Sequence, residues 1–210
     1  MDTALIKLLA AAVVLSIAGC QNPADHLQTG DLLFVGTSGE NPGSMDEAIA
    51  SATGELTHVA IIDMDDDGKT WVIDATPKRG VSRYPLDSLI QDNPDAGFLV
   101  RRLKDTTGVS FFVDNARRFI GAPYDLTFLP DNDAYYCSEL VRDAFQRADG
   151  SHLFEEKPMN FLAPDGTMPP YWEELFEQLD MPVPQGVPGT NPQDLSQSPL
   201  LETVSIRIGK

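Results

Sequence analysis

Residues 57–75 read THVAIIDMDDDGKTWVIDA, and this stretch decides how we expect the chain to fold. It contains two runs rich in β-branched and aromatic residues, at 57–63 and 71–75, which flank an acidic Asp-Gly turn. This arrangement is typical of a β-hairpin. The hairpin predicts an antiparallel sheet, and the neighbouring segments indicate how that sheet continues.

Short apolar runs on both sides of the hairpin supply further strands. We expect these strands at 30–36, 81–84, 98–103 and 201–208. Apolar residues at helical spacing, with glycine at the ends, predict the main helices. These are expected at 85–90, 109–120, 137–148 and 171–179, with a helical turn in the loop at 45–52 and an extended Pro-rich segment at 181–199. Strands followed by helices indicate an α+β fold with an antiparallel sheet of about five or six strands.

The balance of charges excludes one class of partner. The 210 residues include 32 acidic and 15 basic residues, for a net charge of -17. Such a surface repels phosphate backbones, so we expect no nucleic-acid binding. The length suits one globular domain, which we place at 30–210.

The N-terminus has the pattern of an export signal. An apolar run at 8–19 follows Lys7 and is shorter than the ~20 residues of a membrane-spanning helix, so we expect a signal peptide at 1–19. It ends in IAGC at 17–20, which resembles the bacterial lipobox and implies lipid attachment at Cys20, with 20–29 as a tether. Gln21 resembles outer-membrane sorting. The expected location is the cell envelope, lipid-anchored at the outer membrane and facing the periplasm.

Cys137 is the candidate nucleophile. The chain has two cysteines, and lipid on Cys20 would leave Cys137 unpaired in an oxidising compartment. Cys137 begins the predicted helix 137–148, where the helix N-terminus favours a thiolate and offers backbone amides to an oxyanion. Two alternatives stay open: a disulfide between Cys20 and Cys137, and an inert buried thiol.

The candidate base is His58. Of the three histidines, only His58 lies within a predicted strand, while His26 and His152 lie in polar connecting segments. A hairpin turn centred on residue 66 would place His58 opposite Asp74, which could orient the imidazole and complete a Cys-His-acid set.

The same hairpin has a competing interpretation. Residues 63–74 nearly match the calcium loop of an EF-hand, with Asp74 in place of the usual final Glu. An EF-hand needs flanking helices, whereas the flanks here have strand sequence. We therefore favour a turn whose acidic side chains face water.

Four segments together resemble a known family. GDLLF at 30–34, THVAII at 57–62, VIDA at 72–75 and YCSELV at 136–141 resemble the circularly permuted papain-like hydrolases of the YiiX/YebB group, relatives of the NlpC-type cell-wall peptidases. The resemblance covers roughly residues 27–148. It implies a permuted papain-like fold with Cys137 as nucleophile, His58 as base and Asp74 as the orienting residue, where many relatives have Glu.

The expected activity is that of a cysteine hydrolase which cleaves amide bonds, peptide or isopeptide, in cell-wall peptides or related amino-acid amides. Tyr124 and Tyr136 are candidates for lining the cleft or donating to the oxyanion, and packed rings with satisfied hydroxyls are an equal alternative. We expect no cofactor and no metal. The substrate would be a peptide, an amide or a lipid-like molecule. A thioesterase or lipid acyltransferase, and a non-catalytic lipid-anchored or calcium-binding module, are the other hypotheses.

Overall fold

The computed structural model describes residues 26–37 and 43–208. The signal peptide, Cys20 and most of the tether predicted from the sequence lie outside these residues. Within them, no helix has the length and apolar character needed to cross a bilayer.

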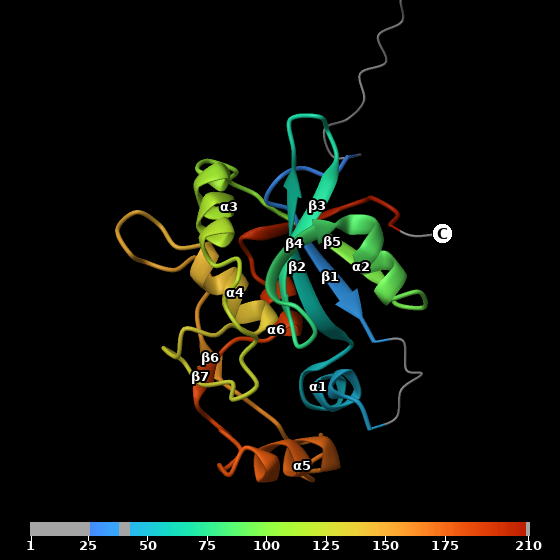
Figure 1. The fold of residues 1–210 in the computed structure, drawn as a ribbon, viewed down its shortest axis with the longest axis vertical. Coiled ribbons are helices and arrows are strands. Elements are labelled where there is room, and N and C mark those ends of the chain that lie inside the picture. Colours follow the sequence, from blue (N-terminus) through green and yellow to red (C-terminus); the bar gives the residue numbers. More distant parts are fainter. Residues whose placement is uncertain (1–25, 38–42, 209–210) are drawn as a thin grey trace, which may run out of the picture.

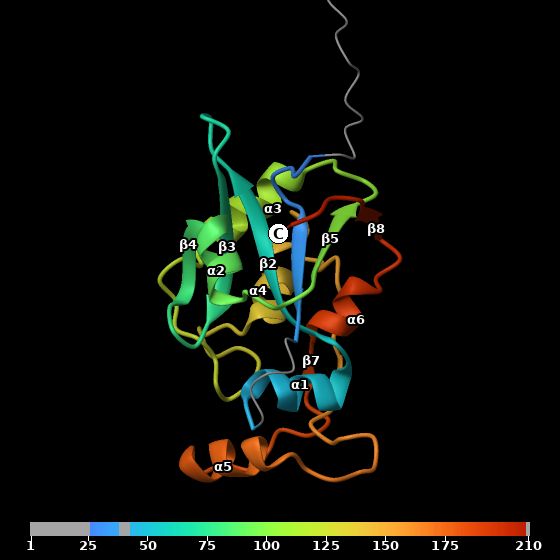
Figure 2. The ribbon, with the colours of Figure 1, turned by 90° about the vertical axis from the view of Figure 1, so that its right-hand side faces the viewer.

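One antiparallel sheet forms the centre of the molecule (Figures 1 and 2). Its strand order is β4-β3-β2-β1-β5-β8. The strands are β1 (Leu32–Gly36), β2 (Leu56–Met64), β3 (Thr70–Thr76), β4 (Gly80–Pro85), β5 (Phe98–Leu103) and β8 (Leu201–Val204). β6 (Lys157–Pro158) and β7 (Pro188–Gly189) form a separate short ladder. The predicted α+β class is confirmed.

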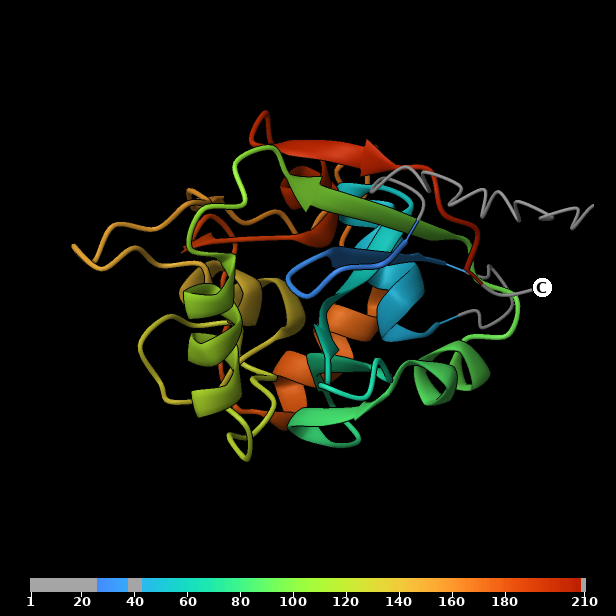
Figure 3. The ribbon, with the colours of Figure 1, turned by 90° about the horizontal axis from the view of Figure 1, so that it is seen from above.

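The helices cover both faces of the sheet. They are α1 (Met45–Thr53), α2 (Leu86–Asp92), α3 (Val109–Arg118), α4 (Cys137–Ala144), α5 (Pro170–Gln178) and α6 (Pro192–Ser196). In the view from above, α3 and α4 lie on one side of the sheet and α2 on the other (Figure 3). α1 and α5 lie together at the lower end of the molecule in Figure 1.

Alternation along the strands divides the core as expected. Val59 and Ile61 pack in the cluster that contains the apolar residues of α3 and α4. Ala60 and Ile62 pack with the apolar residues of α2 on the other face. Both faces of β2 are buried, which explains its nearly continuous run of apolar residues.

The register of the hairpin differs from the predicted one by two residues. Ile61 pairs with Ile73, whereas a turn centred on residue 66 would have paired it with Trp71. The turn lies one residue later because Gly68 takes a positive φ of 78°. A slip of two residues preserves the face of each side chain, so Asp74 stays on the predicted face but lies diagonal to His58.

Two predicted helices end earlier than their apolar patterns suggest. α3 ends at Arg118, and Ile120 is 42% exposed instead of belonging to the buried face. α4 ends at Ala144, and Ala148 is exposed. After α4 the chain turns back on itself, because the Leu153 amide donates to the Phe145 carbonyl.

The structure contains helices where loops were predicted. α1 is a full helix rather than a single turn, and the Ser44 side chain caps it by accepting from the Glu47 amide. α6 lies inside the Pro-rich segment 181–199, with Asn191 as its cap and Pro192 in its first turn. The last strand stops at Val204, short of the predicted end at residue 208.

Candidate active site

Cys137 is the first residue of α4, as predicted. Tyr136 before it is extended, with φ of -88° and ψ of 168°. The thiol is free and only 5% exposed. First-turn amides have no partner within their own helix, so the end of α4 presents N–H groups beside the sulfur.

Glu139 lies in the first turn of α4. Its carboxylate accepts from the Tyr136 amide at 3.4 Å, which caps the start of the helix. Burial and the negative charge of Asp125 raise the pKa of Glu139 to about 8. This buried carboxyl group therefore keeps a proton more readily than an exposed glutamate does.

His58 lies on β2 beside an irregularity in the sheet. Val35 pairs with His58 and Gly36 pairs with Leu56, so Thr57 is an extra residue with no partner on β1. A bulge of this kind redirects side chains at the end of a sheet. His58 pairs with Val35 in the regular part of the ladder, directly beside the bulge, and it contacts both Asp74 and Cys137.

Asp74 on β3 holds the imidazole from one side. The Nε2 atom of His58 lies 2.9 Å from Oδ2 of Asp74, and Asp74 is completely buried. The Tyr84 hydroxyl on β4 donates to the same Oδ2 at 2.7 Å. The carboxylate is therefore fixed from two sides.

The thiol interacts with the imidazole as well. Burial by itself would lower the pKa of His58, but the negative charge of Cys137, hydrogen bonds with Asp74 and Cys137, and the charge of Asp74 raise it well above its usual value. The structure thus brings together the three predicted residues, Cys137, His58 and Asp74. An imidazole that keeps its proton between a thiol and a carboxylate can stabilise a thiolate and can donate that proton.

Tyr84 was not singled out from the sequence, although a signal existed. The pairing of β3 with β4 places Ser82 opposite Asp74, and alternation puts Tyr84 on the same face. Burial and the charge of Asp74 raise the pKa of Tyr84, so its hydroxyl remains a donor. Pairing the predicted strands across the short turn after residue 76 would have revealed this contact.

The two candidate tyrosines are placed differently. The Tyr136 hydroxyl accepts from the Thr190 amide at 3.1 Å, and its ring packs on Phe128. Tyr136 is therefore a packed ring with a satisfied hydroxyl. Tyr124 is half-buried and donates to the sulfur of Met45 at 3.6 Å. Both rings line a small pocket that Cys137 also lines.

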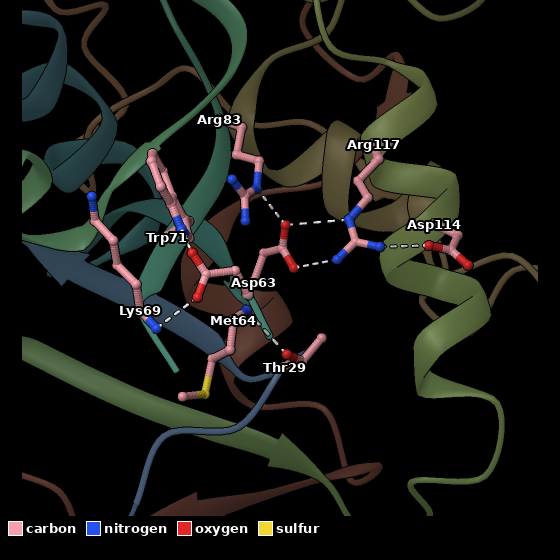
Figure 4. A network of polar contacts seen from close by, with 9 residues as sticks. Thr29, Asp63, Met64, Lys69, Trp71, Arg83, Asp114 and Arg117 are labelled. Atoms are coloured by element: carbon pink, nitrogen blue, oxygen red, sulfur yellow. Dashed lines mark hydrogen bonds and ion pairs between the residues drawn. The ribbon is translucent and has the colours of Figure 1, made fainter. Parts of the chain in front are cut away.

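The acidic hairpin does not assemble a cation site. Asp63, expected to face water, is buried and pairs with Arg83 and Arg117 (Figure 4). Asp65 accepts from the Trp71 indole N–H at 2.8 Å, while Asp66 and Asp67 are exposed as expected. Over residues 26–37 and 43–208, no three His, Cys, Asp or Glu side chains gather in a way that could hold a metal ion.

A thiol at a helix N-terminus, beside a histidine and a carboxylate on neighbouring strands, defines the papain-like class of cysteine-hydrolase folds, here with histidine and acid preceding cysteine along the chain. Comparison with known proteins supports the same class of protein. The chain belongs to the permuted papain-like amidase enzymes of the YaeF/YiiX, C92 family, whose model matches residues 26–205.

Two similar proteins come from Escherichia coli. The uncharacterized protein YiiX of strain K12 is 28% identical over 183 residues, which cover 85% of this chain and 86% of that protein. A crystal structure described as metalloprotein yiiX, from strain O157:H7, superposes with a TM-score of 0.69 at 28% identity and covers 85% of this chain and 96% of that one.

Proposed function

We propose that the protein is a cysteine amidase that cleaves peptide or isopeptide bonds through an acyl-enzyme, with Cys137 as nucleophile, His58 as acid and base, and Asp74 as the orienting residue. The observation that carries this proposal is the position of His58, which bonds Asp74 at 2.9 Å and interacts with the Cys137 thiol. Membership of an amidase family supports the reaction type.

In the first step, the Cys137 thiolate attacks the amide carbonyl carbon and an S–C bond forms. Backbone amides at the start of α4 would hold the oxyanion. The protonated His58 then gives its proton to the amide nitrogen, the C–N bond breaks and the amine leaves.

In the second step, neutral His58 takes a proton from a water molecule, whose oxygen attacks the thioester carbon. The S–C bond breaks and the carboxylic acid leaves. The thiolate and the imidazolium are restored, so water is the only co-reactant. Asp74 keeps the imidazole in the orientation that both steps need.

Cell-wall peptides and related amino-acid amides are the proposed substrates. This choice depends on the proposed export of the chain and on lipid attachment at Cys20, which would hold the enzyme at the outer membrane facing the periplasm. The predicted signal peptide and Cys20 both lie outside the described residues.

One of the two similar proteins is described as a metalloprotein. The residues that the structure describes bring no three suitable ligands together. His58 and Asp74 already bond each other. The donor set among the described residues therefore does not fit a bound metal ion.

The test is incubation of purified protein with muropeptides and with membrane lipids, followed by mass spectrometry. We expect amide products from the wild type, none from Cys137→Ala, and about 10–100-fold less from Asp74→Asn, because an amide cannot stabilise the imidazolium as a carboxylate does. Iodoacetamide should label the wild-type thiol at neutral pH. Amide cleavage that survives Cys137→Ala would refute the mechanism, and turnover of lipid thioesters or acyl groups alone would favour a thioesterase or acyltransferase.

A further inference from the structure

A small pocket adjoins Cys137 at the lower end of the sheet. Its volume is about 40 Å³. α1, the start of α4, α5 and the segment 190–192 each contribute to its lining. The aromatic side chains among them are Tyr124, Phe128, Tyr136, Phe161 and Trp172.

Among the residues that the structure describes, none of those lining this pocket is charged, although the chain has a net charge of -17. An ion bound there would lose its hydration without gaining a counter-charge, which is costly. The pocket therefore suits a neutral group with considerable apolar surface.

Three buried polar atoms in the lining residues have no hydrogen-bond partner within the described part of the chain. They are the Ser138 hydroxyl, the Trp172 indole N–H and the Thr190 hydroxyl. Their residues are 1%, 2% and 8% exposed. A buried polar group without a partner is costly, and an indole N–H can only donate. These atoms have almost no surface open to the pocket, so the pocket presents apolar surface to a bound group.

Cys137 lines the pocket, whereas His58 does not. The departing amine must take its proton from His58, whereas the acyl group stays bonded to the sulfur after the amine has left. A substrate group in a pocket that the sulfur lines and the imidazole does not line therefore fits the acyl half of the substrate better than the departing amine.

Resting on the proposed function, we propose that this pocket binds the side chain of the acyl half and selects a neutral, apolar group. A leucine-like side chain fits this description. Glutamate and lysine side chains do not.

The experiment measures alkylation of Cys137 by N-acetylaminoacyl chloromethyl ketones, in which sulfur displaces chloride, so it does not depend on amide hydrolysis. We expect the glutamine ketone to react about tenfold faster than its isostere, the glutamate ketone, and the leucine ketone to exceed the lysine ketone by a similar factor. Each rate is divided by the rate with iodoacetamide, to correct for thiol reactivity. Equal rates, or faster reaction of a charged ketone, would overturn the inference while leaving amide cleavage to be judged separately.

Two variants sharpen the test. Ala52→Asp places a carboxylate in the lining and should reverse the preference towards lysine, whereas Ala50→Asp, on the same helix but outside the lining, should not. An unchanged preference in Ala52→Asp would refute the location of the pocket.

Discussion

At the scale of single residues, the unusual feature is a histidine with two acidic neighbours. His58 has Asp74 on one side and the Cys137 thiol on the other, and both raise its pKa against the opposing effect of burial. Its side chain is 19% exposed, so substrate and water have access to it.

Replacing Cys137 with serine should lower the pKa of His58. The hydroxyl does not ionise, so the charge that raises the imidazole pKa is lost and the value moves towards about 6.5. Because the folded-state pKa is raised, the stability that protonated His58 contributes is complete below the unfolded-state pKa and is lost as the pH rises through the folded-state value. NMR titration of the imidazole measures the change, and an unchanged pKa would contradict the ion-pair interpretation.

Tyr84 should act as a positioning residue. Tyr84→Phe removes the 2.7 Å hydrogen bond to Asp74 but keeps the ring, so we expect kcat/KM to fall about three- to tenfold with little change in KM. The pH dependence of activity should also shift, because the carboxylate that faces His58 loses a donor. Tyr135→Phe is the control, since the Tyr135 ring packs on Phe119 away from Asp74. Identical kinetics and pH profiles in both variants would rule out this role.

At the scale of elements, a buried carboxylate joins α3 to the sheet. Asp63 on β2 bonds Arg83 of β4 and Arg117 of α3, each at 2.6 Å (Figure 4). Asp63 is completely buried, while the two arginines are partly exposed and screened by water.

Asp63→Asn should reduce the free energy of unfolding by about 2–3 kcal/mol, because two arginines lose their shared counter-charge. Asp114→Asn is the matched control: Asp114 bonds the same Arg117 but is 55% exposed, so we expect a loss of under about 0.5 kcal/mol. Urea unfolding of the three proteins gives the values. Equal losses in both variants would show that the buried position of Asp63 does not matter.

Glu139 makes the start of α4 sensitive to pH. Its pKa of about 8 lies above the usual value, so the protonated carboxyl favours the folded state and this stability is lost between about pH 4.5 and pH 8. Glu139→Gln keeps an oxygen acceptor for the Tyr136 amide without a titrating group. The variant should therefore gain stability relative to wild type as the pH rises, by no more than about 5 kcal/mol. Unfolding curves from pH 5 to pH 9 that run parallel for the two proteins would contradict this.

At the scale of the whole molecule, three apolar clusters stabilise a strongly acidic chain. Two lie on the opposite faces of the sheet. The third joins α1, α5 and the aromatic rings near the pocket, including Phe161 and Trp172. The packing of this third cluster shapes the wall of the pocket beside Cys137.

The net charge of -17 should make stability depend on salt. Repulsion among acidic side chains opposes the compact state, and ions screen it over about 8 Å at physiological ionic strength. We expect the Tm to rise by several degrees between about 10 mM and 150 mM sodium chloride. Differential scanning calorimetry would measure it, and a Tm that falls across this range would show that attractive ion pairs dominate.

Local signals in the sequence were enough to predict the class of fold and to select Cys137, His58 and Asp74. The alternation of side chains predicted which residues of β2 face each side of the sheet, and the apolar pattern after Tyr136 predicted that a helix begins at Cys137. Both signals could be read because they depend only on residues that are neighbours along the chain. The choice of His58 needed only the observation that the other histidines lie in connecting segments.

The way in which those residues meet depends on the tertiary structure. The hairpin register, the bulge at Thr57 and the contact of Tyr84 with Asp74 depend on which strands pair and where a turn closes. Capping residues and chain reversals determine where α3 and α4 end and why α6 forms. The spacing of apolar residues does not reveal these features. The pocket beside Cys137 draws on segments from α1 to residue 192, and only packing in three dimensions brings such distant residues together.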